Sequence, residues 1–147
     1  MATFHVEIIT PEKVVFQGEV DSVSLPTPQG EITILPHHIP IISIVVPGSV
    51  LIRKGSDEQL FAVSRGVIEV DGKTVRVLTE TADRAAELEE EAIEKAKKAA
   101  EQLLHEKRDD VEGFAEATAL LERELARLHV ARRHRGRSRT PHINTDQ

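Results

Sequence analysis

Apolar and polar side chains alternate along the first half of the chain, which is the period-two pattern of half-buried β-strands. Residues 3–9 place Phe4, Val6 and Ile8 on one face, with polar side chains between them. Similar short apolar runs recur up to residue 78, separated by turns rich in Gly and Pro. Asp71-Gly72 is the strongest hairpin signal, because both central positions of a type I′ turn need a positive φ. The pattern predicts about nine to ten strands in an N-terminal antiparallel β-sandwich.

A pair of histidines separates two neighbouring apolar runs in this half of the chain. Pro36 and Pro40 bracket the pair. Proline lacks a backbone N–H, so each of the two ends a hydrogen-bonded ladder. The chain must therefore turn here, and it holds His37 and His38 at an exposed loop tip between two buried strands. Such a rigid polar loop is typical of a contact surface.

The period changes to that of helices from about residue 87. Ala, Glu, Lys and Leu dominate, and proline is absent until Pro141. The apolar face of the first helix comprises Leu88, Ala92, Ala96, Ala99 and Leu103. A second, coiled-coil-like seam comprises Val111, Phe114, Thr118, Leu121, Leu125 and Leu128. With a short polar break at residues 107–110, the pattern predicts an antiparallel two-helix hairpin.

The domain boundaries expected from these patterns are residues 1–85 for the sandwich, 86–131 for the hairpin and 132–147 for a disordered basic tail. The first helix offers mostly alanine, which buries little apolar area. At about 1.5–3 kcal/mol per large buried side chain, less the ordering entropy, docking of the hairpin is worth only a few kcal/mol. The sequence leaves open whether the hairpin switches between positions or stays permanently docked.

Composition narrows the possible functions. The chain of 147 residues is 39% hydrophobic but only 3% aromatic, and it contains no cysteine. There is thus no thiolate site, and few large rings could stack on bases or sugars. The net charge is −6, yet residues 129–147 carry five basic and one acidic side chain. Only this tail could seek an acidic partner by electrostatics. We expect a protein of a reducing cytoplasm whose link to any membrane is peripheral.

Candidate chemistry is sparse. No Ser, His and carboxylate arrangement indicates catalysis, and there is no Gly-rich phosphate loop. His37 and His38 are adjacent, so their side chains diverge on an extended chain, which makes a poor metal site. A free-standing sandwich that binds a ligand or metal through this loop stays as the alternative. Nucleic-acid binding through the tail is a third reading, weakened by the acidic remainder of the chain.

Several motifs, in order, resemble the epsilon subunit of the bacterial F-type ATP synthase. Phe16-Gln17-Gly18 is similar to an early strand pair of that family. Residues 30–41 resemble its Gly-Glu-x-x-Ile-x-Pro-Gly-His-x-Pro-Leu segment, and residues 66–70 its Gly-Gly-x-x-Glu-Val strand. The resemblance covers residues 2–131.

The resemblance implies a non-catalytic central-stalk subunit that needs no cofactor. In that family the sandwich packs on the gamma subunit and on polar loops of the membrane c-ring, and it couples proton-driven rotation to ATP synthesis. The hairpin can extend alongside gamma, contact an acidic segment of the beta subunits and inhibit ATP hydrolysis. The implied location is peripheral, on the cytoplasmic face of the bacterial plasma (inner) membrane.

The resemblance also implies contact residues. Glu31 and His38 would face the c-ring. Candidates for the acidic beta segment are Arg123, Arg127, Arg132, Arg133 and Arg135, the last three being inferred from charge.

Two departures from the family pattern stand out. His37 replaces the glycine that precedes the family's histidine. Some members bind ATP through an Ile/Leu-Asp-x-x-Arg-Ala motif at the start of the first helix, where this chain has Leu88, Glu89, Ala92 and Ile93. Because the arginine of that motif is missing, we expect no tight ATP binding by the isolated subunit.

Overall fold

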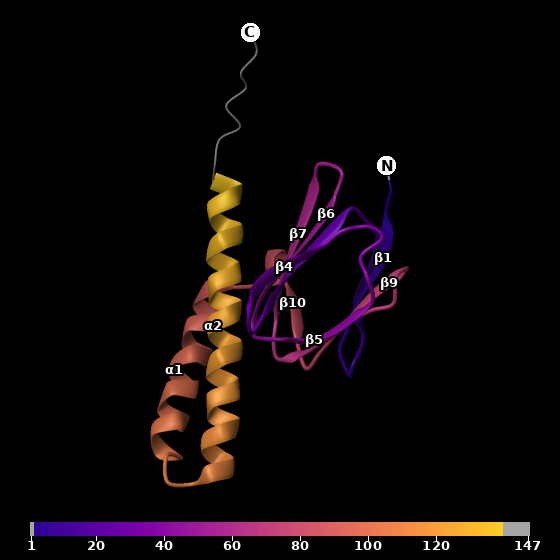
Figure 1. Ribbon diagram of the computed structural model, residues 1–147. Coiled ribbons are helices and arrows are strands. Elements are labelled where there is room, and N and C mark those ends of the chain that lie inside the picture. Colours follow the sequence, from indigo (N-terminus) through magenta and orange to yellow (C-terminus); the bar gives the residue numbers. More distant parts are fainter. Residues whose placement is uncertain (1, 140–147) are drawn as a thin grey trace.

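The computed structural model describes residues 2–139, which form a β-sandwich followed by a helical hairpin (Figure 1). The strands of one sheet are β1 (Phe4–Ile9), β2 (Val14–Val20), β5 (Ile41–Val45), β8 (Gly66–Val70) and β9 (Thr74–Thr79). Those of the other are β3 (Ser22–Thr27), β4 (Gly30–Ile34), β6 (Gly48–Lys54), β7 (Asp57–Val63) and β10 (Ala82–Arg84). A 3-10 turn, η1 (Ala85–Glu87), leads to the helices α1 (Glu90–Glu106) and α2 (Val111–Arg139). The predicted order of sandwich and hairpin is confirmed.

The core of the sandwich lies between the two sheets. Their strand orders are β2-β1-β9-β8-β5, called sheet A here, and β10-β7-β6-β3-β4, called sheet B. Phe4, Val6 and Ile8 of β1 point into this core, as their alternation predicts. Phe16 and Phe61 meet edge to face with ring centroids 5.8 Å apart. The other buried core residues are Val, Ile and Leu, as expected for a chain with few aromatic residues.

One strand pair departs from the antiparallel prediction. β1 lies between β2 and β9, and it pairs with β9 in parallel, His5 opposite Thr74 and Ile9 opposite Leu78. The first and last strands of sheet A are thereby neighbours. Local alternation cannot indicate this pairing, because it depends on residues about seventy positions apart.

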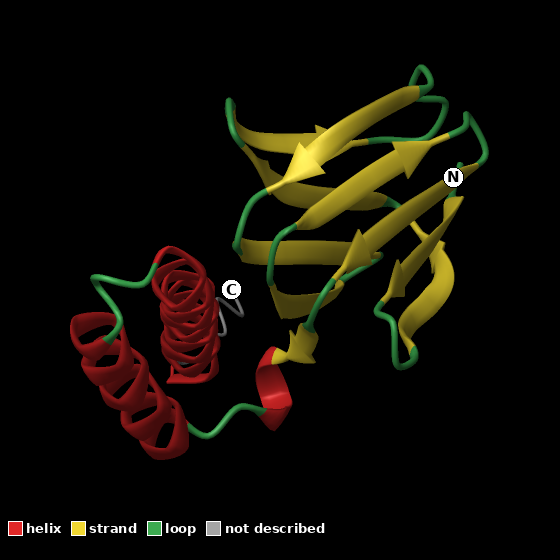
Figure 2. Cartoon of the chain, turned by 90° about the horizontal axis from the view of Figure 1, so that it is seen from below, coloured by secondary structure: helices red, strands yellow, loops and turns green. Residues whose placement is uncertain are grey.

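The hairpin packs on the outer face of sheet B at β6 and β7, with α2 between α1 and the sandwich (Figures 1 and 2). Val130 of α2 is fully buried against Leu51 and Leu60 of that face. On its other side, α2 packs Leu128 and Ala131 against Ile93 of α1. The long helix therefore has two buried faces, one toward sheet B and one toward α1.

The predicted seam of α2 is wrong in its position. Val111 is 86% exposed and Leu125 is 44% exposed. The buried residues of α2 are Ala117, Glu124, Leu128, Val130 and Ala131. The predicted face of α1 is shifted as well, because Ile93 and Ala100 are buried whereas Ala92 and Ala99 are exposed. A seam that carries a buried glutamate cannot be found by counting apolar positions.

The expectation of a disordered tail from residue 132 is wrong for residues 132–139, because α2 continues to Arg139. This extension lacks apolar periodicity, but Arg132 and Arg135 form ion pairs with Glu90 at the start of α1. Ion pairs with a distant part of the chain thus stabilise the helix in a stretch where the local apolar pattern predicts no helix. Residues 140–147 of the predicted tail lie outside the described residues.

Candidate functional site

The histidine loop is a tight turn whose geometry explains its sequence. The backbone N–H of His38 donates to the carbonyl of Leu35 at 3.2 Å, and Pro36 is the second residue of this turn. His37 is the third and has a φ of +65°. Proline followed by a residue of positive φ is the pattern of a type II turn, which favours glycine at the third position. His37 therefore occupies a glycine position, as the departure from the family motif suggested.

Glu31 and His38 lie along one edge of the sandwich. Glu31 is an exposed residue of β4, which is the edge strand of sheet B. His38 follows the opposite end of β4, and its Nδ1 lies 2.7 Å from the carbonyl oxygen of Ile39. The length of β4 separates the two side chains, so together they form an extended edge and not a single cluster. Leu35 and Ile39, 57% and 71% exposed, add apolar surface beside His38.

An exposed apolar row crosses the outer face of sheet A. Ile44 of β5 lies opposite Val67 of β8, and Val67 lies opposite Leu78 of β9. These three side chains, called the apolar row here, are 56%, 40% and 40% exposed. Ile42, on the same side of β5 as Ile44, is 78% exposed. Exposed apolar patches of this kind mark interaction sites. Sequence reasoning missed this surface, although β5 is apolar on both faces, which was a usable signal.

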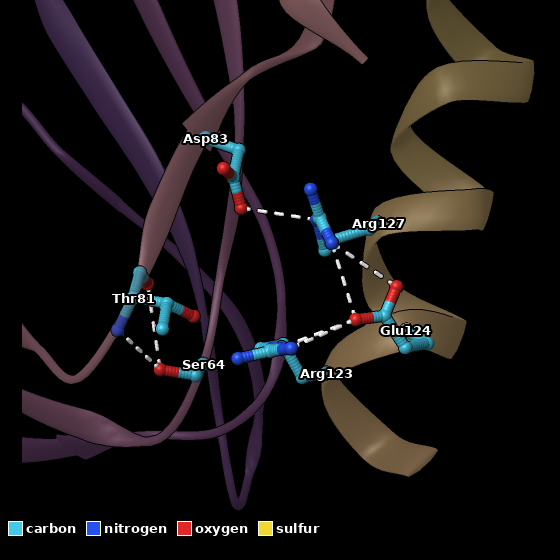
Figure 3. A network of polar contacts seen from close by, with 6 residues as sticks. All are labelled: Ser64, Thr81, Asp83, Arg123, Glu124 and Arg127. Atoms are coloured by element: carbon cyan, nitrogen blue, oxygen red, sulfur yellow. Dashed lines mark hydrogen bonds and ion pairs between the residues drawn. The ribbon is translucent and has the colours of Figure 1, made fainter. Parts of the chain in front are cut away.

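A cluster of charged side chains joins α2 to the sandwich (Figure 3). The carboxylate of Glu124 is 2% exposed and accepts hydrogen bonds from Arg123 at 3.1 Å and from Arg127 at 3.1 Å. Arg127 also places its Nε 3.1 Å from Oδ2 of Asp83 in β10. This last contact is an ion pair without good hydrogen-bond alignment. Asp83 is therefore the residue through which the sandwich holds this cluster.

Hydrogen bonds to Ser64 fix the strand that carries Asp83. The backbone N–H of Thr81 donates to Ser64 Oγ at 2.7 Å, and the backbone N–H of Ser64 donates to the carbonyl of Thr81 at 3.1 Å (Figure 3). The short β10 then pairs with the end of β7, with Asp83 opposite Ala62. The geometry of the last sandwich strand thus positions Asp83 toward α2.

Arg132, Arg133 and Arg135 of α2 make contacts within the chain as well. Arg132 lies 3.1 Å from Glu90 and 3.2 Å from Glu94, and Arg135 lies 2.7 Å from Glu90. Arg133 donates to Ser49 Oγ of β6 at 3.3 Å. All five arginines that sequence reasoning chose for an acidic partner are thus engaged inside the chain in this docked arrangement. The resemblance pointed to Arg123 and Arg127 and charge to the other three, and the structure shows which groups each contacts within the chain.

The described part of the chain contains neither a cluster of metal ligands nor a membrane-spanning helix. Within residues 2–139, no three His, Cys, Asp or Glu side chains gather in a way that could hold a metal ion. In the same range no helix has the length and hydropathy needed to cross a bilayer.

Comparison with known proteins relates this arrangement to one family. The model of a family described as ATP synthase, Delta/Epsilon chain, beta-sandwich domain matches residues 3–85. An ATP synthase epsilon chain of Halalkalibacterium halodurans is 39% identical over 133 residues, covering 90% of this chain and 100% of that protein. One of Neisseria meningitidis is 42% identical over 130 residues, covering 87% and 92% of the two chains. The fold also matches a chain in the cryo-EM structure of the Euglena gracilis mitochondrial ATP synthase, with a TM-score of 0.69 at 21% identity, covering 83% and 77%.

Proposed function

The chain belongs to the family of ATP synthase epsilon chains, and from this membership we propose how it acts in the central stalk. As a stalk component, it couples proton-driven rotation of the c-ring and the gamma subunit to ATP synthesis, and it carries out no catalysis itself. Its C-terminal helices restrain ATP hydrolysis. It is a peripheral subunit on the cytoplasmic face of the bacterial plasma membrane. Family membership over most of the chain length is the observation that carries this proposal.

The apolar row is the surface proposed to bind gamma. The apolar side chains Leu51 and Leu60 on the outer face of sheet B are covered by α2 of the chain's own hairpin. Ile44, Val67 and Leu78 instead leave an apolar strip exposed on the outer face of sheet A. Burying this strip against a partner would gain about 25 cal/mol per Å² of apolar surface. A stalk subunit needs such a permanent attachment to rotate with its neighbours.

Exchange of Leu78 for a charged residue tests this attachment. We expect Leu78→Asp to weaken assembly with gamma by at least about tenfold, because it places a carboxylate within an apolar contact. Binding of the purified full-length chain to gamma, measured by titration calorimetry, gives the result. Glu69→Asp, on the neighbouring position of the same sheet face, is the matched control. Unchanged affinity for gamma would assign the apolar row to a different partner.

The edge formed by Glu31 and His38 is proposed to face the polar loops of the c-ring. Both side chains are accessible there, and neither belongs to the sandwich core. We expect the double variant Glu31→Ala, His38→Ala to lower ATP-driven proton pumping in the reconstituted enzyme while the unfolding midpoint of the free chain stays within about 1 °C. Normal pumping would contradict this assignment.

The hairpin is proposed to inhibit ATP hydrolysis through the arginines of α2. Truncation after residue 86 removes both helices and should raise the hydrolysis rate of the reconstituted enzyme. A milder variant, Arg123→Gln with Arg127→Gln, keeps the hairpin but removes two positive charges. Like the truncation, it should raise the rate of ATP hydrolysis. If neither variant changes hydrolysis, the hairpin has no inhibitory role in this enzyme.

The alternative of a free-standing ligand- or metal-binding module is not favoured, because relatives along most of the chain are ATP synthase subunits. That the isolated subunit has no tight ATP site stays a prediction. Calorimetric titration of the isolated chain with ATP tests it, and micromolar affinity would contradict it.

A further inference from the structure

The charged cluster on α2 contains equal numbers of positive and negative groups. Arg123 and Arg127 supply two guanidinium groups, and Glu124 and Asp83 supply two carboxylates. The side chains of both arginines are largely shielded, 35% and 26% exposed. A shielded charge is costly unless a partner compensates it. Glu124 contacts both arginines, and Asp83 adds a second carboxylate beside Arg127.

The two carboxylates differ in where they reside. Glu124 is on α2 itself, one residue from Arg123 and three from Arg127, so it stays with the arginines wherever the helix goes. Asp83 is on β10 and is the sandwich's own contribution to the cluster. When α2 leaves the sandwich, Arg127 loses Asp83 but keeps Glu124. The arginine pair then has one positive charge in excess.

We propose that Asp83 acts as an intramolecular stand-in for an acidic partner segment, so that docking of the hairpin and binding of that segment are mutually exclusive uses of Arg127. The inference rests on the proposed function, in which these arginines meet an acidic partner, and it adds how the contact is regulated. The partner must supply at least one carboxylate that replaces Asp83. Glu124 sets the orientation of both guanidinium groups and thereby keeps the two arginines in position to bind a carboxylate, whether the hairpin is docked or undocked.

The geometry of the cluster supports this exclusivity. Arg127 lies between α2 and β10, with Asp83 on one side and Glu124 on the other (Figure 3). Ser64 and Thr81 hold the start of β10, so Asp83 is presented at a fixed place. A second acidic chain reaching Arg127 would meet the carboxylate of Asp83 and be repelled. The acidic segment can therefore engage Arg127 only after the helix has moved away from the sandwich.

The first test measures docking in the free, full-length chain. Since the sequence has no cysteine, Lys73→Cys and Asp109→Cys provide two labelling sites, one on the sandwich and one at the hairpin turn, for energy transfer. We expect Asp83→Asn to raise the ratio of undocked to docked chains about threefold to tenfold, as for a partly exposed ion pair. Glu116→Gln, an exposed glutamate on the same helix, should leave the ratio unchanged.

A double-mutant cycle makes this test specific to the ion pair. Arg127→Gln should undock the hairpin at least as much as Asp83→Asn, because it also removes a partner of the buried Glu124. Adding Asp83→Asn to Arg127→Gln should then do little more than Arg127→Gln alone. An unchanged ratio in Asp83→Asn, or fully additive effects in the double variant, would overturn the proposal.

The second test measures competition with poly-L-glutamate as the acidic probe, at low salt and with no other subunit present. Asp83→Asn should bind it more tightly than the unmodified chain, by the same factor as the gain in undocking. Adding Arg123→Gln and Arg127→Gln should remove that gain. Undocking without tighter binding would overturn the exclusivity. Failure of the proposed function is distinguishable, because it shows as unaltered ATP hydrolysis in the reconstituted enzyme and not in the free chain.

Discussion

The backbone of His37 has a φ of +65°, which places an ordinary L-residue in the left-handed region. This conformation costs a non-glycine residue about 1–2 kcal/mol. The cost is tolerated because Pro36 and the hydrogen bond from His38 to Leu35 fix the turn around it. Strain kept at an exposed loop tip is consistent with a surface selected for contact and not for stability.

Replacement of His37 by glycine should therefore stabilise the free chain. Relief of the left-handed strain is partly offset by the extra entropy that glycine brings to the unfolded state, leaving a gain of about 0.5–1 kcal/mol. Urea denaturation of the full-length chain measures it. His38→Gly is the matched control and should destabilise, since the backbone of His38 has no positive φ to relieve. A His37→Gly variant that is less stable than the parent would refute the strain argument.

A second residue-scale prediction concerns the β8–β9 turn. The Oδ1 of Asp71 accepts the backbone N–H groups of Lys73 at 2.9 Å and Thr74 at 2.7 Å. The hydrogen bond from Thr74, and then that from Lys73, holds the pKa of Asp71 below its ordinary value of 3.8. The backbone N–H of Asp71 donates to the carbonyl of Thr74 at 3.2 Å, so Gly72 and Lys73 are the central residues of the turn. Of these two only Gly72 has a positive φ, which is the pattern of a type II′ turn and not of the predicted type I′.

The lowered pKa of Asp71 gives a definite pH dependence. Its carboxylate contributes stability that is fully present above the ordinary pKa, and this contribution is lost as pH falls through the lower pKa of the folded state. NMR titration of the Asp71 carboxyl in the folded chain should give a value below 3.8. The Asp71→Asn chain should lose less stability than the parent over that acidic window. A titration at or above the ordinary value would contradict the role of these hydrogen bonds.

At the scale of elements, the contact between α1 and α2 depends on charge as much as on apolar packing. Ile93, Leu128 and Ala131 form a small apolar cluster. Glu90 meets Arg132 and Arg135 at the open end of the hairpin. The arginine side chains are about half exposed, so solvent screens these pairs and reduces their contribution. The end of α2 should therefore be held in a salt-dependent way.

Glu90→Gln tests this contribution of charge. We expect a loss of less than about 1 kcal/mol in overall stability, together with faster amide exchange in the last turns of α2. Glu91→Gln, at an exposed neighbouring position, is the control and should change neither quantity. The difference between the two variants should shrink as salt is added. If exchange in α2 does not respond to Glu90→Gln, the extension beyond residue 131 has another origin.

Sequence patterns predicted the elements better than their contacts. Alternation identified the strands because each sandwich strand has one buried face, and the change of period identified the hairpin. The burial of Glu124 could not be predicted from the sequence, because a carboxylate is buried there only since Arg123 and Arg127 both contact it. The basic residues beyond residue 131 could be chosen from charge and Arg123 and Arg127 from the family resemblance. Asp83 could not be chosen in either way, because its contact with Arg127 depends on where β10 lies relative to α2.

At the scale of the whole molecule, the sandwich and the hairpin have separate apolar cores. The sandwich core draws its residues from positions 4–77. Docking of the hairpin adds a smaller cluster in which Val130 covers Leu51, Leu60 and Ala62 of sheet B. The sandwich should therefore fold without the hairpin, at the cost of an exposed apolar patch.

A chain truncated after residue 88 tests this separation. It should unfold cooperatively, and it should bind the dye ANS more strongly than the full-length chain, because Leu51 and Leu60 lose their cover. In the truncated chain, Leu60→Ser should lower the dye binding again, whereas the exposed substitution Glu58→Gln should not. A truncated chain that fails to unfold cooperatively would show that the sandwich needs its helices.

The parallel pairing of β1 with β9 affects how the protein folds during its synthesis on the ribosome. β1 emerges first, but one of its two neighbours in the sheet is made only when residues 74–79 have been synthesised. Until then one edge of β1 has open backbone groups, which is a hazard for association between nascent chains. Closing so long a loop also slows folding relative to a protein built from hairpins alone. Sheet A is therefore completed only late in synthesis, when β9 pairs with β1.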